Sequence, residues 1–187
     1  IDIYSTKRWT PGKEKCGNYK YVGDCVNREH SFPKSWFDDK SPMVPDAFHI
    51  YPTDGKVNGQ RSNFPYGECA NGTTLPSSNG VQALGKFGTS TFPGYSGKVF
   101  EPVDEYKGDL ARTYFYMAAA YNDKISTWSS DMLAGNAYPA YKTWALNLLL
   151  KWHRQDAVSE KETDRNDAVY GFQNNRNPFI DHPELVE

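Results

Sequence analysis

Hydrophobic positions in the last third of the chain recur every three to four residues, the period of an amphipathic helix. We therefore expect helices over about 104–122 and 138–156. The side chains that share a face are Leu110, Tyr114 and either Met117 or Ala118 in the first stretch, and Trp144, Leu148 and Trp152 in the second.

A third helix is predicted to begin after Ser159 and to run to about residue 174. Ser159 followed by Glu162 matches a capping box, in which the serine caps the helix and the glutamate bonds back to it. The sequence 175–178, which ends in Pro178, should then end the helical run.

The first hundred residues carry a different pattern, with short aromatic and β-branched runs separated by Gly, Pro and Asn. Residues 46–51 have the composition of a strand, and a short helix over about 53–63 follows Pro52. Gly55 and Gly59 weaken that helix. Further strands are predicted at 19–22, in the stretch that leads into Glu29 and His30, at 81–84 and at 98–100.

These elements predict an α+β fold, a single domain over residues 1–187 with strand, loop, strand and helix at about 27–63 and a C-terminal helical layer. We find no internal repeat and no linker that would divide the chain. The length of 187 residues is sufficient for one hydrophobic core.

Composition narrows the function classes only slightly. Hydrophobic residues make up 38% and the mean hydropathy is −0.75, but aromatic residues reach 15%, which favours a folded chain. The net charge of −2 is unusual for a nucleic-acid binder, since phosphate contacts need Lys and Arg. No apolar run is long enough to span a membrane. The chain has no initiator Met and no signal peptide, so we expect a mature form.

The cysteines are Cys16, Cys25 and Cys69, and an odd number excludes a fully paired monomer. One disulfide between Cys16 and Cys25 and a set of free thiols are both compatible with the spacing. No zinc-site spacing is present.

The strongest chemical candidate is the dipeptide Glu29-His30. A carboxylate can hold a hard cation such as Mg²⁺, and an imidazole can take a proton from water near neutral pH. In an extended segment these neighbours point to opposite faces, so the chain must twist or turn near Pro33 for both to reach one phosphate. A solvated surface pair is the simpler alternative.

Other candidates each have a structural alternative. Asn58 and Arg61 share a face of the expected helix, where they could bind metal and phosphate, but Asn58-Gly59 could instead form a turn. Asn63 is a second candidate ligand. His49 suits a structural histidine, and Arg112 suits either a buried ion pair or a phosphate contact.

Four separated blocks resemble, in order, the bacterial endonuclease I family, secreted or periplasmic nucleases of the His-Me finger (ββα-metal) type. The blocks are 27–36 (NREHSFPKSW), 52–63 (PTDGKVNGQRSN), 109–112 (DLAR) and 175–181 (NRNPFID).

The resemblance implies a metal-dependent endonuclease of low sequence specificity that acts on DNA, and often on RNA, and leaves 5′-phosphates. It implies that His30 is the general base and that Glu29 and Asn58 hold Mg²⁺, or Ca²⁺ or Mn²⁺ in its place. We expect a secreted or periplasmic monomer that does not bind membranes. The expected substrate contacts are Lys34, Arg61, Asn63, Arg112 and Arg176.

Two rival functions are also compatible with the sequence. A non-catalytic secreted carbohydrate-binding module would use exposed Tyr and Trp side chains, in keeping with the aromatic content and the acidic pI. A phosphodiesterase for small nucleotides would need a closed pocket instead of an open cleft.

Overall fold

The computed structural model describes residues 2–187, and its internal contacts group into two compact units. Unit 1 comprises Ile1–His30 and Ile50–Val103, and unit 2 comprises Ser31–His49 and Asp104–Glu187. Both helices and short sheets are present, so the predicted α+β class is confirmed. No helix among residues 2–187 is long and apolar enough to cross a bilayer.

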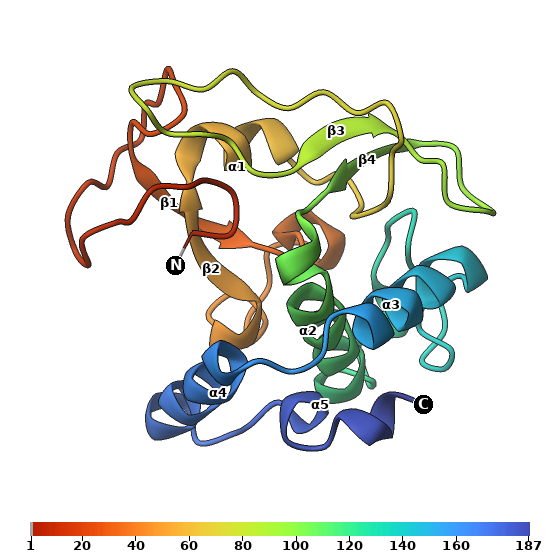
Figure 1. Cartoon of the computed structure of the whole chain (residues 1–187). Helices are drawn as coiled ribbons and strands as arrows, with labels where there is room; N and C mark the ends of the chain where they lie inside the picture. Colours follow the sequence, from red (N-terminus) through yellow and green to blue (C-terminus); the bar gives the residue numbers. More distant parts are fainter. Residues whose placement is uncertain (1) are drawn as a thin grey trace. The chain divides into compact units, whose positions relative to one another are not determined.

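Unit 1 contains two antiparallel strands followed by a helix (Figure 1). Strand β1 (Val26–His30) pairs with β2 (Ile50–Asp54), with Glu29 opposite Tyr51 and His30 opposite Ile50. Helix α1 (Gly55–Arg61) begins directly after β2. The order strand, strand, helix was predicted for this region.

The boundary between β2 and α1 differs from the prediction. Asp54 caps the helix, because its Oδ1 accepts a hydrogen bond from Val57 N at 3.0 Å. Its Oδ2 accepts from Gly23 N at 2.6 Å. Pro52 therefore lies in the strand, and the helix starts later than expected. Asn58 and Gly59 are both helical, so the alternative of a turn at this dipeptide is wrong.

The two glycines of α1 have a packing reason. A Cβ atom at Gly55 would lie 2.8 Å from the Tyr19 ring, and one at Gly59 would overlap the same ring. The Tyr19 ring thus packs against the face of α1 that carries the two glycines. Residues 19–22 themselves form an irregular segment and a turn, so the strand predicted there is wrong.

The remainder of unit 1 is held by short elements and one disulfide. Strands β3 (Lys86–Thr89) and β4 (Lys98–Glu101) form an antiparallel pair, as predicted for the second of them. Residues 81–84 make only isolated bridges, so the strand predicted there is wrong. Cys16 and Cys25 form a disulfide, and Cys69 is buried and not disulfide-bonded.

Unit 2 is mainly helical (Figure 1). Its α-helices are α2 (Lys107–Ala120), α3 (Thr143–Gln155), α4 (Glu160–Gln173) and α5 (Pro178–Asp181), and its 3₁₀ turns are Lys34–Phe37, Ala47–His49, Asp104–Tyr106, Ile125–Thr127 and Pro183–Val186. Helix α2 packs against α3 and α5. The three predicted long helices are therefore present, although α3 begins later than expected.

Aromatic side chains supply much of the core of unit 2. The ring of Phe32 lies 5.0 Å from Trp36, 5.1 Å from Tyr114 and 5.6 Å from Trp128, measured between centroids. All four side chains are buried. Large rings bury much area per residue, which explains how a chain of low mean hydropathy forms a dense core.

The strand predicted at 46–51 is wrong over its first four residues, because β2 begins at Ile50. Ala47–His49 forms a 3₁₀ turn, stabilised by a 3.0 Å hydrogen bond from Phe48 N to Oδ1 of Asp46. His49 is fully buried, and its ring nitrogens lie 3.2 Å from Phe32 O and 2.8 Å from Met43 O. The interpretation of His49 as a structural histidine is confirmed, and burial lowers its pKa.

Candidate functional site

Glu29 and Arg61 form a buried ion pair that joins β1 to α1. Nη1 of Arg61 lies 2.8 Å from Oε1 of Glu29, and the side chains are 0% and 3% exposed. The hydroxyl of Tyr4 donates to the same oxygen at 2.7 Å and lies 2.6 Å from the hydroxyl of Tyr66. Arg61 also stacks over the Tyr66 ring at 4.4 Å. The carboxylate is thus held in one orientation by groups from three segments.

The electrostatics of Glu29 are a balance of opposing effects. Burial raises the pKa of this carboxyl, whereas the Arg61 charge and the hydrogen bonds from Tyr4, Arg61 and Tyr66 lower it. Burial outweighs the other contributions. A buried carboxylate of this kind gains from additional positive charge nearby.

His30 is the last residue of β1 and is half-buried. Its backbone oxygen accepts a hydrogen bond from Nη1 of Arg61 at 3.2 Å. Because side chains alternate along a strand, His30 faces the side opposite to Glu29, together with Arg28. The burial of Glu29 between the exposed Arg28 and the half-buried His30 agrees with the alternation expected from the sequence. That the two side chains reach one phosphate remains a prediction.

Asn58 and Asn63 occupy different environments. Asn58 lies within α1, is half-buried, and precedes Arg61 by three positions. Residues at this spacing share a helix face, so Asn58 lies on the side of α1 that contacts Glu29. Asn63 follows the helix C-cap Ser62 and is exposed. Of the two asparagines, Asn58 is better placed to bind the same metal ion as Glu29.

The cations expected to contact phosphate all have carboxylate partners. Beside the Arg61–Glu29 pair, the N···O distances are 2.9 Å for Lys34–Asp39, 2.6 Å for Arg112–Glu162, and 2.7 Å for both Arg176–Asp181 and Arg176–Asp167. Arg112 is fully buried and also donates to Asp156 O at 2.8 Å. Of the two alternatives for Arg112, the structure therefore contains the buried ion pair.

Tyr4 and Tyr66 are site residues that sequence reasoning missed. They lie 25 residues before and 37 residues after Glu29, and no local pattern links either to that carboxylate.

A groove of about 740 Å³ lies in unit 1 beside β1. Its lining residues are Trp9–Gly12, Lys15, Cys16, Val26–Arg28, Ile50 and Pro52. Arg28 lies opposite Pro52 and Ile50 opposite His30, so the groove includes the face of the β1–β2 pair that carries His30. Sequence reasoning did not assign a groove here, although strand alternation alone places Arg28 on the His30 face.

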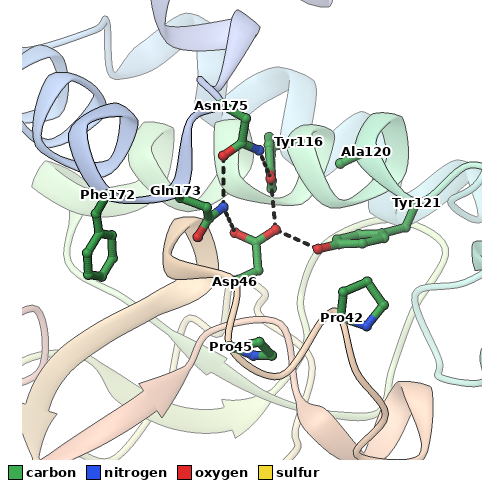
Figure 2. A pocket seen from close by; sticks show the side chains of 9 residues that line it. All are labelled: Pro42, Pro45, Asp46, Tyr116, Ala120, Tyr121, Phe172, Gln173 and Asn175. Atoms are coloured by element: carbon green, nitrogen blue, oxygen red, sulfur yellow. Dashed lines mark hydrogen bonds between the residues drawn. The ribbon is translucent and has the colours of Figure 1, made fainter.

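A second cavity, of about 620 Å³, lies in unit 2 around Asp46 (Figure 2). Asp46 accepts hydrogen bonds from Tyr116 at 2.8 Å, Tyr121 at 2.7 Å and Gln173 at 3.0 Å, and Asn175 donates to Tyr116 at 2.8 Å. Burial, followed by the contact with Asp46, raises the pKa of both tyrosines, so they remain protonated donors. The apolar residues that line this cavity are Pro42, Pro45, Ala120 and Phe172. The polar groups of this cavity bond to one another.

Glu29 and Asn58 provide oxygen donors for a hard metal cation. The carboxylate of Glu29 and the carboxamide of Asn58 come from β1 and from the facing side of α1, and Mg²⁺ needs only one or two protein oxygens. Within residues 2–187, no group of three or more His, Cys, Asp and Glu side chains is arranged to hold a metal. The chemistry of the two donors fits a cation that keeps most of its waters.

Comparison with known proteins identifies the family. A model of the endonuclease I family matches residues 1–184. An extracellular ribonuclease of Bacillus amyloliquefaciens is 38% identical over 180 residues, which are 94% of this chain and 57% of the relative. The extracellular ribonuclease of Bacillus subtilis (strain 168) is 38% identical over 171 residues, 89% of this chain and 54% of the relative.

A more distant relative is named as a deoxyribonuclease. An extracellular deoxyribonuclease of Aeromonas hydrophila is 29% identical over 145 residues, which are 77% of this chain and 52% of the relative. The chain spans about half the length of these curated relatives. Since the family model covers nearly the whole sequence, the chain belongs to the endonuclease I family.

Proposed function

We propose that this chain is a metal-dependent endonuclease of low sequence specificity that hydrolyses phosphodiester bonds in DNA and RNA. The observation that supports it most directly is the buried Glu29–Arg61 pair, which ties β1 to the helix carrying Asn58. His30 follows Glu29 directly at the end of β1. These residues form the strand, strand and helix segment that we assign to the ββα-metal core.

His30 acts as the general base in the proposed reaction. Its imidazole removes a proton from a water molecule, and the water oxygen forms a bond to phosphorus. The bond from phosphorus to the 3′ oxygen breaks, and that oxygen leaves with the electron pair and takes up a proton. The products are a 3′-hydroxyl and a 5′-phosphate.

Glu29 and Asn58 hold the cation, for which Mg²⁺ is the first choice. When bound, the cation supplies charge neutralisation at the phosphoryl oxygens and at the departing oxygen. Arg61 is a positioning residue, because its bond to Oε1 fixes the Glu29 carboxylate. Arg112 is assigned a structural part, since its guanidinium is bound by Glu162 inside unit 2.

Lys34 and Asn63 remain proposed substrate contacts. Lys34 is 39% exposed and its partner Asp39 is 58% exposed, and a surface ion pair of this kind is weak enough to open for a phosphate. Arg176 is held by two carboxylates and would have to release one of them.

An extracytoplasmic location agrees with two observations. The relatives include extracellular nucleases, and the Cys16–Cys25 disulfide is typical of oxidising compartments. We therefore propose that the protein acts outside the cytoplasm on DNA and RNA.

The rival carbohydrate-binding module has little support. It needs a platform of exposed aromatic side chains, whereas Trp36, Trp128, Trp144 and Trp152 are buried. The exposed tyrosines, Tyr21, Tyr138 and Tyr170, come from three separate segments of the chain. Trp9 is half-buried and lines the groove, but its neighbours there include cations.

The test is cleavage of supercoiled DNA and of RNA with Mg²⁺, and again after EDTA is added. His30→Ala should reduce the rate by about 10²–10⁴-fold, the usual contribution of a general base, and leave the circular dichroism spectrum unchanged. His182→Ala is the matched control, because this histidine is exposed and lies outside the site. Full activity in His30→Ala would refute the assignment. A substrate range limited to small nucleotides would favour the phosphodiesterase instead.

A further inference from the structure

Two positively charged side chains in the groove beside β1 form no ion pair with a carboxylate, unlike the other candidate phosphate contacts. Arg28 and Lys15 are exposed, and within residues 2–187 neither makes an ion pair. By contrast, Lys34, Arg112 and Arg176 are each paired with an acid. The groove therefore offers positive charge that is not neutralised by the protein.

The groove also contains an aromatic ring in a fixed orientation. The indole Nε1 of Trp9 donates to Oδ2 of Asp2 at 2.8 Å, and Nζ of Lys7 lies 4.4 Å from the centroid of the ring. Lys7 is itself held by Gly23 O at 2.7 Å. A ring fixed in this way loses little side-chain entropy when a ligand stacks on it.

The wall that carries Lys15 is anchored to β1. Cys16 is bonded to Cys25, the residue before the strand, and Val26 N donates to Glu14 O at 2.9 Å. Residues 15 and 26 also form a parallel bridge. The two cations are thus presented by segments that are fixed to each other.

We propose that this groove binds a nucleotide of a single-stranded stretch of the substrate, with its phosphate on Arg28 and Lys15 and its base against Trp9. The proposal rests on the proposed nuclease function. Arg28 precedes His30 by two positions on the same strand face, about 7 Å along the strand, so the bound nucleotide would lie close to the one that is cleaved.

The chemistry favours a nucleic-acid strand over other ligands. Paired cations suit phosphate, and an aromatic ring suits any base, since stacking does not depend on base identity. A groove of about 740 Å³ is large enough for one nucleotide. In a duplex the base faces are stacked on one another, so only an unpaired stretch can use Trp9.

The experiment measures binding separately from hydrolysis. A fluorescein-labelled eight-residue oligothymidylate and a duplex of the same length are titrated with His30→Ala protein, without divalent cation, and the Kd is read from fluorescence anisotropy. Arg28→Ala, Lys15→Ala and Trp9→Ala are added in this background. The matched control is Arg8→Ala, an exposed arginine of the same segment that does not line the groove.

For the single strand, Arg28→Ala and Trp9→Ala should each raise the Kd about tenfold. Arg28→Ala should also make the slope of log K against log salt less steep, by the amount expected for the loss of about one phosphate contact. Trp9→Phe should restore most of the affinity, which separates stacking from a folding defect. Arg8→Ala should change the Kd by less than about twofold, and the duplex should bind more weakly than the single strand.

Three results would overturn the inference: an equal loss in Arg8→Ala and Arg28→Ala, tighter binding of the duplex, or unchanged affinity in Trp9→Ala. These results leave the nuclease proposal intact if the protein with His30 cleaves DNA or RNA. Conversely, a protein that cleaves neither refutes the proposed function, and the binding data still decide the role of the groove.

Discussion

Arg61 and Glu29 lie 2.8 Å apart, Nη1 to Oε1, with no more than 3% of either side chain exposed. The pair links α1 to β1, and it involves the carboxylate that we assign to the metal. Stability and activity are therefore coupled at this position.

Arg61→Met should destabilise the protein by about 3–5 kcal/mol, because it leaves the Glu29 carboxylate buried without its charged partner. The measurement is urea unfolding followed by circular dichroism. Arg61→Met combined with Glu29→Gln should be less destabilised than Arg61→Met alone, since no buried charge is left unpaired. A loss below about 1 kcal/mol in Arg61→Met would contradict the buried pair.

The two asparagines can be distinguished by their metal dependence. Asn58→Ala should raise the Mg²⁺ concentration needed for half-maximal cleavage by about tenfold or more, because a ligand to the cation is lost. Asn63→Ala should leave that concentration unchanged and raise KM instead, since this exposed residue is proposed to contact substrate. The comparison is a Mg²⁺ titration of the initial cleavage rate. The opposite pattern would move the ligand to Asn63.

The sequence was most informative where the signal was local. The predicted capping box is present, with Ser159 Oγ accepting from Glu162 N and the Glu162 side chain accepting from Ser159 N. Four residues determine this geometry, so it could be predicted without knowledge of the fold. A strand that leads into Glu29 and His30 was also predicted and is present as β1, whereas its antiparallel pairing with β2 was not predicted.

Long-range contacts were not predictable from these patterns. At residues 46–49 the local Asp46–Phe48 turn replaces the predicted strand, and contacts of the His49 ring with the carbonyls of Met43 and the more distant Phe32 hold it. The partner of Arg112 is Glu162, 50 residues away, and that of Arg61 is 32 residues away. Such long-range contacts decide that these two arginines face a carboxylate and not phosphate. Lys34 and Arg176 instead pair with acids five residues away, and residue types alone do not show whether such a pair forms.

Asp109 predicts a pH dependence of stability. Burial, then the charge of Glu162, raises the pKa of Asp109 to about 7, against the ion pair with Lys161 at 2.9 Å. Arg112 and Asp156 also face this carboxyl. The folded state therefore binds the proton more tightly than the unfolded state, whose pKa is near 3.8. This contribution to stability is full below the unfolded value and is lost as pH rises through about 7.

Asp109→Asn isolates this effect from the other carboxyls. The wild-type free energy of unfolding should fall by about 2–3 kcal/mol more than that of Asp109→Asn between pH 5 and pH 8. The measurement is urea unfolding across this range, and the result is the difference between the two proteins. Parallel pH profiles would show that Asp109 is ionised throughout.

The Cys16–Cys25 disulfide should stabilise unit 1, because it closes a short loop and so restricts the unfolded chain. For a sequence separation of 9 residues, the chain-entropy relation gives about 2–3 kcal/mol. The double variant Cys16→Ser and Cys25→Ser, or wild type with dithiothreitol, should lose this amount in urea unfolding. Dithiothreitol should not affect the double variant, since the remaining Cys69 forms no disulfide.

The same bond anchors the groove wall that carries Lys15, so its loss should affect binding as well as stability. The double variant should therefore bind the single-stranded oligonucleotide more weakly under conditions in which it is still folded. If stability falls but the Kd does not change, the disulfide serves the fold alone and Lys15 is positioned by the backbone contacts to Val26. If neither changes, the bond does not constrain this segment in solution.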